Sequence, residues 1–208
     1  MQSHRSCIRL ILVELICTGL SSGSLNIIVN GDFQNGNLDF YTEFKYSPGD
    51  IVPEHTYDVL SDPHLSHPNA TSYYDHTLGT QEGMMLAVNG KRYISQPDVV
   101  WSQTVSVSSG TSYVLSLWHS LWCPGPAGLQ VYVNGVPLGQ EFMAGSSVMG
   151  EWIEFRERWE AFSTSIACIE IVNTTASVIA NDFALDDITL TDAVALDRQT
   201  WASIKYIW

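Results

Sequence analysis

The stretch NDFALDDITL, residues 181–190, contains two alternating apolar patterns that are out of phase by one residue. Four apolar residues carry the two patterns: Phe183, Leu185, Ile188 and Leu190. Side chains of a β-strand alternate strictly between its faces, so the change of phase indicates one extra residue in the strand, a β-bulge. Asp186 and Asp187 lie at the break.

Two carboxylates in the middle of an apolar strand need partners. A buried carboxylate is unfavourable unless it is hydrogen-bonded, paired with a charge or bound to a metal. We therefore expect Asp186 and Asp187 either to bind a cation or to cap backbone amides at the edge of a sheet.

Similar short, strand-like segments follow one another along most of the chain, separated by turn residues. They are LNIIVNGDF (25–33), TYDVLSD (56–62), GMMLAVNG (83–90), VWSQTVSV (100–107), SYVLSLWHSLW (112–122), GLQVYVNGVPLG (128–139), EWIEFRERWEAF (151–162), IACIEIVN (166–173) and FALDDITL (183–190). This regular spacing, without helical periodicity between the segments, predicts an all-β fold, a β-sandwich or jelly roll. Asn134-Gly135 and Asn89-Gly90 each predict a tight hairpin turn.

Composition favours one globular domain with a substantial core. The chain has 208 residues, of which 45% are apolar and only 15% are charged. Its formal net charge of -13 disfavours nucleic acid and anionic membranes as partners, because both carry negative charge. We expect a monomer, with the sandwich over residues 24–190 and a tail over residues 191–208.

The first residues have the order of an export signal. Two arginines precede the apolar run LILVELICTGL (10–20), and small residues follow it. We expect residues 1–23 to be a signal peptide and the protein to be secreted or held at the cell surface; an ordinary buried N-terminal segment is the alternative. Export would permit a disulfide between Cys123 and Cys168, although their spacing does not require one.

Three motifs resemble carbohydrate-binding modules of the CenC type in their order and spacing. They are NIIVNGDFQNGN (26–37), VWSQTVSVSSGTSYVLSLW (100–118) and FALDDITL (183–190), and the resemblance extends over residues 25–190. It implies a galactose-binding-like jelly roll, a structural calcium ion and glycan binding on a concave sheet.

The resemblance also implies where calcium would bind. Asp186 matches the family's late calcium ligand, and Gln34 stands where the family usually has glutamate. Calcium takes oxygen ligands from carboxylates, amides and carbonyls, so Asp32 and Asp187 complete the candidate set.

Strand parity separates a core face from an outward face. Leu115, Leu117 and Leu121 share one face of the segment 112–122, and Val131 and Val133 share one face of the segment 128–133. The opposite faces carry a mixture of aromatic and polar residues: Trp118, Trp122, Gln130, Tyr132, Glu154, Arg156 and Arg158. Aromatic rings beside a few polar groups are typical of a sugar-binding site. The alternative is that a loop or second layer covers the rings.

Catalytic signatures are missing from the sequence. We find no paired-carboxylate motif of a jelly-roll glycosidase, no G-x-S-x-G, no P-loop and no H-E-x-x-H. We therefore expect a secreted, non-catalytic module that binds a neutral glycan and holds structural calcium. The alternative is an extracellular structural or adhesive domain without a sugar ligand. Exposure of Trp118 and Trp122 beside Tyr132 in one groove would favour sugar binding.

Overall fold

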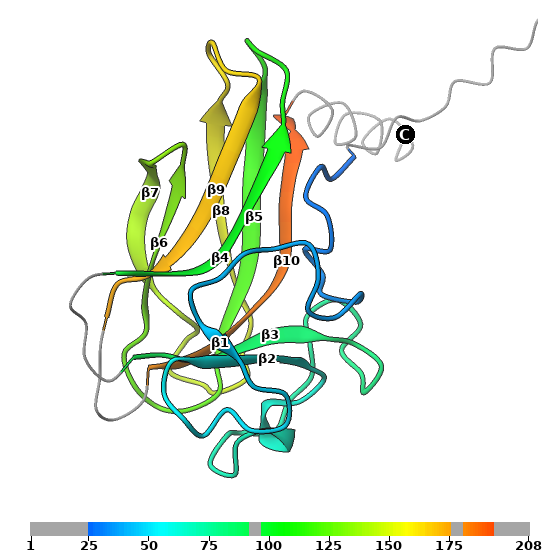
Figure 1. Cartoon of the computed structure of the whole chain (residues 1–208), viewed down its shortest axis with the longest axis vertical. Helices are drawn as coiled ribbons and strands as arrows, with labels where there is room; N and C mark the ends of the chain where they lie inside the picture. Colours follow the sequence, from blue (N-terminus) through cyan, green and yellow to red (C-terminus); the bar gives the residue numbers. More distant parts are fainter. Residues whose placement is uncertain (1–24, 92–96, 176–180, 194–208) are drawn as a thin grey trace, which may run out of the picture.

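The computed structural model describes residues 25–91, 97–175 and 181–193 (Figure 1). Within these ranges the regular structure is almost entirely β-strand, arranged as two sheets that form a sandwich. The six-stranded sheet has the order β1-β2-β3-β10-β5-β8, and the four-stranded sheet has the order β4-β9-β6-β7. The predicted all-β jelly-roll sandwich is therefore confirmed.

Every strand pairing is antiparallel except that of β1 with β2. The six-stranded sheet contains β1 (Lys45–Tyr46), β2 (Thr56–Leu60), β3 (Met85–Asn89), β5 (Ser112–Leu121), β8 (Ile153–Glu160) and β10 (Asp182–Asp192). The four-stranded sheet contains β4 (Asp98–Ser106), β6 (Gly128–Val133), β7 (Val136–Met143) and β9 (Ile166–Asn173). A short 3₁₀ helix, η1 (Pro63–Leu65), interrupts the loop after β2.

The main core lies between the two sheets and follows the predicted parity. The predicted core residues of β5 and β6 are all buried: Leu115, Leu117, Leu121, Leu129, Val131 and Val133. Trp101 of β4 is fully buried in the same cluster. Burial of these apolar side chains, at roughly 1.5–3 kcal/mol each, is the main force that holds the sheets together.

The bulge predicted in β10 is confirmed. The pairing of β10 with β5 shifts register between Asp186 and Thr189, and Asp187 has a φ of 46°. A residue with positive φ cannot continue the ladder of hydrogen bonds, so the strand changes phase at this point.

The strand predicted over residues 25–33 is wrong. Asparagine side chains replace the ladder there: the Oδ1 atom of Asn26 accepts hydrogen bonds from the backbone N–H groups of Ile28 and Leu190. Asn30 adopts a φ of 53°, which is incompatible with an extended strand. Asparagine side chains compete with backbone partners in this way, so the segment runs beside β10 as an irregular loop.

One of the two predicted hairpins is confirmed. Asn134 and Gly135 have φ values of 51° and 74° and connect β6 to β7. The turn predicted at Asn89-Gly90 is wrong, because β3 and β4 belong to different sheets. The backbone N–H of Gly90 donates instead to the carbonyl oxygen of Asn181 at 2.9 Å.

Loops form a second layer over the outer face of the six-stranded sheet. A separate apolar cluster joins the loop residues to that face: Ile51, Leu60, Ala70, Met85, Ala87, Trp122 and Ala184. The region between β1 and β3 therefore packs on the sheet rather than projecting from it.

Several sequence predictions concern residues that the structure does not describe. The predicted signal peptide and residues 194–208 of the predicted tail lie outside the described ranges. Among the described residues, no helix is long and apolar enough to span a membrane. Cys123 and Cys168 are both free thiols.

Candidate functional site

The predicted sugar-binding face does not form a single surface. Trp118 lies on β5 of the six-stranded sheet, whereas Tyr132 lies on β6 of the four-stranded sheet. The outer faces of a sandwich point in opposite directions, so these two rings cannot share a ligand. Gln130, on the same face as Tyr132, is buried, and its Nε2 atom donates to the carbonyl oxygens of Val131 and Leu138 at 2.9 and 3.3 Å.

Trp122 is part of the interior, so the prediction that it faces outward to a ligand is wrong. Its exposed fraction is 0%, and its indole N–H donates to the carbonyl oxygen of Phe183 at 2.9 Å. Strand β5 ends at Leu121, and the second layer covers the ring of Trp122 from outside. The alternative interpretation, in which a loop covers the aromatic rings, is therefore correct for Trp122.

The remaining predicted residues do share a face. Glu154 lies directly opposite Trp118 across β5 and β8, and Arg156 and Arg158 follow on the same side of β8. The Nη1 atom of Arg156 lies 3.2 Å from Oε1 of Glu154. The ring of His76 stacks on Trp118 with a centroid distance of 3.8 Å and an interplanar angle of 15°. One face of Trp118 is therefore already occupied by a loop residue.

Asp186 is fully buried at the bulge and binds backbone N–H groups. Its Oδ2 atom accepts from the N–H groups of His76 and Thr77 at 2.7 and 3.1 Å, and its Oδ1 atom accepts from Asp187 at 2.8 Å. Burial, with the nearby charge of Asp187, raises the pKa of Asp186 to about 8. Asp186 therefore fixes the loop that precedes β3 onto β10.

These contacts do not fit a cation at Asp186, because N–H groups surround the carboxylate. Asp187 has two partners: the Nδ1 atom of His76 lies 2.6 Å from its Oδ2 atom, and the hydroxyl of Thr77 donates to its Oδ1 atom at 2.8 Å. Asp32 and Asp187 line a hollow of about 190 Å³, and Gln34 donates from Nε2 to the carbonyl oxygen of Asp32 at 3.1 Å. The described residues contain no group of three or more His, Cys, Asp or Glu side chains that could hold a metal. Calcium binding stays a prediction.

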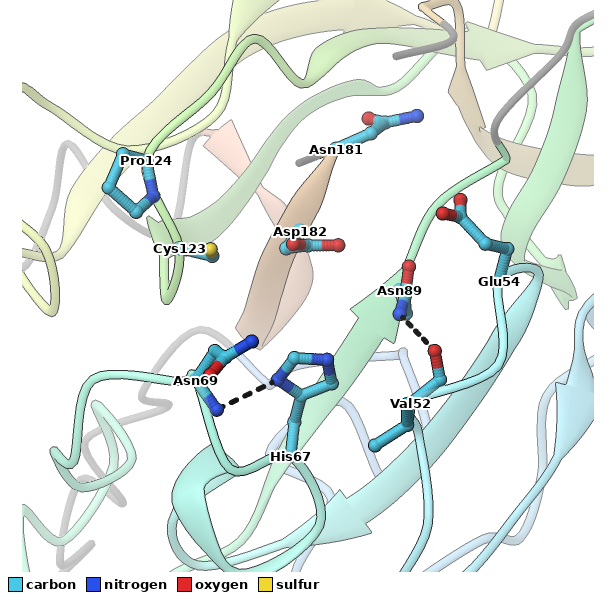
Figure 2. Close-up of a pocket in the computed structure, with 9 residues that line it drawn as sticks. All are labelled: Val52, Glu54, His67, Asn69, Asn89, Cys123, Pro124, Asn181 and Asp182. Carbon is cyan, nitrogen blue, oxygen red and sulfur yellow. Dashed lines mark hydrogen bonds between the residues drawn. The ribbon is translucent and has the colours of Figure 1, made fainter. Parts of the chain in front are cut away.

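A different site emerges at the end of β3 and the start of β10, where a pocket of about 420 Å³ opens (Figure 2). Its walls come from five separate segments of the chain. They are the loop before β2 (Val52 and Glu54), the loop after β2 (His67 and Asn69), the end of β3 (Asn89), the residues after β5 (Cys123 and Pro124), and the start of β10 with the residue before it (Asn181 and Asp182).

Asp182 supplies a carboxyl group in this pocket. It pairs with Asn89 across β10 and β3, and its exposed fraction is 6%. Burial raises its pKa to about 6, and the charge of Glu54 acts in the same direction. Burial raises the pKa of the Cys123 thiol, and the neighbouring charge of Asp182 acts in the same direction. Cys123 therefore lacks the thiolate character of a nucleophile.

His67 supplies a hydrogen-bond donor. Its Nδ1 atom accepts from the backbone N–H of Asn69 at 3.2 Å, and its ring packs on Trp122 at a centroid distance of 5.0 Å. Burial lowers the pKa of His67, which keeps the ring neutral at pH 7. The neutral ring with Nδ1 as acceptor carries its hydrogen on Nε2, which is thus a donor.

Two asparagines are held rigidly at the pocket. Asn89 donates from Nδ2 to the carbonyl oxygens of Ile51 and Val52 at 2.8 and 3.3 Å, and its amide oxygen points away from them (Figure 2). Asn181 and Asn173 exchange reciprocal hydrogen bonds of 2.9 and 3.0 Å between their amide groups. These side chains are oriented by the protein before any ligand arrives.

Sequence reasoning missed this pocket, because no motif joins its residues. The one available signal was the position of two polar residues at strand ends: Asn89 closes an apolar segment, and Asp182 opens another. Their pairing across the sheet depends on the topology, which the sequence does not state.

The fold is a jelly-roll β-sandwich of the kind that carbohydrate-binding modules have. No family model and no curated protein sequence matches the chain. Among solved structures, the Stig cyclase Fisc from Fischerella sp. TAU is 14% identical, with a TM-score of 0.54, covering 81% of this chain and 98% of that one.

Two further matches are carbohydrate-binding modules. The CBM22-1–CBM22-2 tandem of Paenibacillus barcinonensis Xyn10C is 14% identical with a TM-score of 0.51, covering 82% of this chain and 46% of that one. TmCBM61, solved in complex with β-1,4-galactotriose, is 17% identical with a TM-score of 0.48, covering 81% and 99% of the two chains. Identities this low show a shared fold and nothing finer.

Proposed function

We propose that this domain binds a neutral glycan non-covalently in the pocket of Figure 2. One observation carries the proposal: Asn89, His67 and Asp182 come from distant parts of the chain and converge on one pocket of about 420 Å³. Pockets of this size that contain a few oriented polar groups are typical of small-ligand sites.

The chemistry of the walls favours a sugar. Asp182 and Asn89 offer acceptor oxygens and His67 offers a donor, which suits hydroxyl groups because these both donate and accept. Val52 and Pro124 supply apolar walls for the C–H groups of a ring. Among the described residues that line the pocket, the charged side chains are acidic, so an anionic sugar is disfavoured.

The tandem of carbohydrate-binding modules that shares the fold at a TM-score of 0.51 supports the proposal. Membership of the CenC type, secretion and a monomeric state belong to the same proposal. They rest on the sequence motifs and the export-like first residues.

A glycan array, followed by calorimetric titration of the best ligand, tests the proposal. We expect Asp182→Asn to weaken binding about tenfold, because one hydrogen bond to a charged group contributes about 1.5 kcal/mol. His67→Phe keeps a ring on Trp122 but removes the donor, so it should also weaken binding. Glu170→Gln, on β9 of the opposite sheet, is the matched control.

Equal affinity of the wild-type protein and both pocket variants would place the binding site elsewhere. If no glycan on the array binds, an extracellular structural or adhesive domain without a sugar ligand becomes the better reading.

A second candidate is acid catalysis in the same pocket. Asp182, with a pKa raised to about 6, retains its proton in mildly acidic solution and can act as a general acid. Cyclases share the fold at TM-scores of 0.54 and 0.52. Recovery of the bound ligand unchanged, measured by mass spectrometry, favours binding. Conversion that is lost in Asp182→Asn favours catalysis.

A further inference from the structure

The sequence contains two Asn-X-Thr triplets, the acceptor motif for N-linked glycans. They are NAT (69–71), in the loop after β2, and NTT (173–175), which begins at the last residue of β9. A triplet can carry a glycan in the folded protein only where its asparagine has room for a bulky group at the surface. The structure separates the two triplets on this ground.

The folded protein has no room for a glycan at Asn173, whose exposed fraction is 1%. Its Nδ2 atom donates to the carbonyl oxygen of Gly128 at 3.1 Å and to Oδ1 of Asn181 at 3.0 Å, so both amide hydrogens are used. An N-linked glycan replaces one of these hydrogens. Either replacement would leave a buried acceptor without its donor, so the folded protein should not carry a glycan at this residue.

Asn69 has the opposite surroundings. Asn69 and Thr71 are both exposed, and within the described ranges the side-chain amide of Asn69 forms no hydrogen bond. The backbone around it is anchored: the N–H of Ala70 donates to the carbonyl oxygen of His67 at 3.1 Å, and the N–H of Thr71 donates to that of Trp122 at 2.8 Å. The turn is therefore held on the protein while the side chain of Asn69 remains free to carry a group.

This free side chain belongs to the wall of the pocket of Figure 2. Asn69 lines the pocket beside His67, and the Cys123 thiol lies in the same pocket. The pocket has a volume of about 420 Å³, and an N-linked oligosaccharide is bulky. An oligosaccharide attached at Asn69 would therefore stand at the opening.

We propose that Asn69 is an N-glycosylation site and that its glycan restricts entry to the pocket. In the modification, Nδ2 of Asn69 forms a bond to C1 of the first sugar of a lipid-pyrophosphate-linked oligosaccharide. The bond from C1 to the pyrophosphate oxygen breaks, the lipid pyrophosphate leaves, and the amide gives up one proton. The modification rests on the proposed export of the chain, and its effect on ligands rests on the proposed glycan binding.

Production of the full chain in human cells tests the modification by mass spectrometry of its peptides. A heterologous secretion leader makes the result independent of residues 1–23. We expect an oligosaccharide on the peptide that contains Asn69 and none on the peptide that contains Asn173. Thr71→Ala should abolish the modification, and Thr71→Ser, which keeps the acceptor motif, should retain it. A bare Asn69 in the wild-type protein, or an oligosaccharide at Asn173 in the folded protein, would overturn the proposal.

The thiol of Cys123 reports entry to the pocket without any glycan ligand. In alkaline buffer, where thiols ionise, iodoacetamide should label Cys123 more slowly in the glycosylated wild-type protein than in Thr71→Ala. Cys168, a free thiol on β9 of the four-stranded sheet, should react equally in both proteins and is the internal control. Equal labelling of Cys123 in the two proteins would overturn the restriction of entry.

The best ligand from the glycan array should bind the glycosylated protein about tenfold or more weakly than Thr71→Ala from the same cells. Wild-type protein and Thr71→Ala made in a bacterial cytoplasm, without a glycan at Asn69, should bind it equally, because Thr71 does not line the pocket. Equal affinity of the glycosylated and unglycosylated proteins would overturn the restriction of entry. Absence of glycan binding by every form would overturn the proposed function alone, because the peptide masses and the labelling of Cys123 do not depend on it.

Discussion

His119 of β5 is buried in a neutral state that acid should destabilise. Its Nδ1 atom accepts from the backbone N–H of Gly145 at 2.8 Å, and burial lowers its pKa to about 4. Between pH 6.5 and about 4, the unfolded chain binds a proton at this residue and the folded protein does not. Stability should therefore fall as the pH falls through this range, by about 3 kcal/mol in full.

Urea unfolding at a series of pH values measures this loss, and His119→Asn removes it. The comparison with the variant is necessary because Asp182 and Asp186 have raised pKa values and titrate in the opposite sense, losing stability as the pH rises. Wild-type and variant curves that run parallel from pH 7 to pH 4 would contradict the assignment to His119.

Trp122 should be essential for stability rather than for binding. Trp122→Ala leaves a cavity in the second apolar cluster and removes the hydrogen bond to Phe183, so we expect a loss of about 3–5 kcal/mol. Trp118→Ala, at a half-buried ring, should cost less. Chemical denaturation measures both. If Trp122→Ala left the stability unchanged but abolished glycan binding, the prediction that Trp118 and Trp122 form the ligand-binding face would be supported instead.

The bulge of β10 should hold the loop before β3 in place. Asp186→Leu removes the acceptor for the N–H groups of His76 and Thr77, so hydrogen exchange at these two amides should accelerate about tenfold or more. Asp186→Asn, which keeps an acceptor oxygen, should have a smaller effect. Unchanged exchange in Asp186→Leu would show that the loop is held by other contacts.

Calcium at Asp32, Gln34, Asp186 and Asp187 has a direct test in thermal melting with calcium and with a chelator. The calcium prediction requires the two melting curves to differ, whereas coincident curves would mean that the N–H groups around Asp186 satisfy it without a cation. A bound ion would stabilise the fold by about 2.7 kcal/mol at a hundredfold excess over its Kd. A clear rise of the Tm with calcium would therefore favour the calcium prediction over the contacts seen here.

Within single strands, the sequence correctly predicted which residues face the core and where the bulge lies. The alternation in β5 and β6 placed their core residues correctly, and the phase change at Asp186 located the bulge, because both depend only on the period of a strand. The strand predicted over residues 25–33 was wrong because asparagine side chains take the place of the backbone hydrogen bonds there. An apolar pattern does not reveal such a replacement. The prediction that Trp122 faces a ligand was wrong because loops from distant parts of the chain cover its ring. The sequence of its own strand does not show this coverage.

Across the whole molecule, the fold was predictable and the candidate site was not. Regular strand spacing identified a sandwich, but it did not state which strands share a sheet, so Trp118 and Tyr132 were placed on one face. The pocket depends on Asp182 and Asn89 being neighbours across β10 and β3, a pairing between residues far apart in the sequence. Sites of this kind become visible only when the topology is known.

The location of bound glycan is the measurement that most directly tests the central claim. In a titration of the ¹⁵N-labelled protein with the best ligand from the array, we expect the largest shifts at the side-chain amides of Asn89 and Asn181 and at His67, with saturation that Asp182→Asn weakens. Largest shifts at Trp118, or on the outer face of the four-stranded sheet around Tyr132, would contradict glycan binding in the pocket of Figure 2.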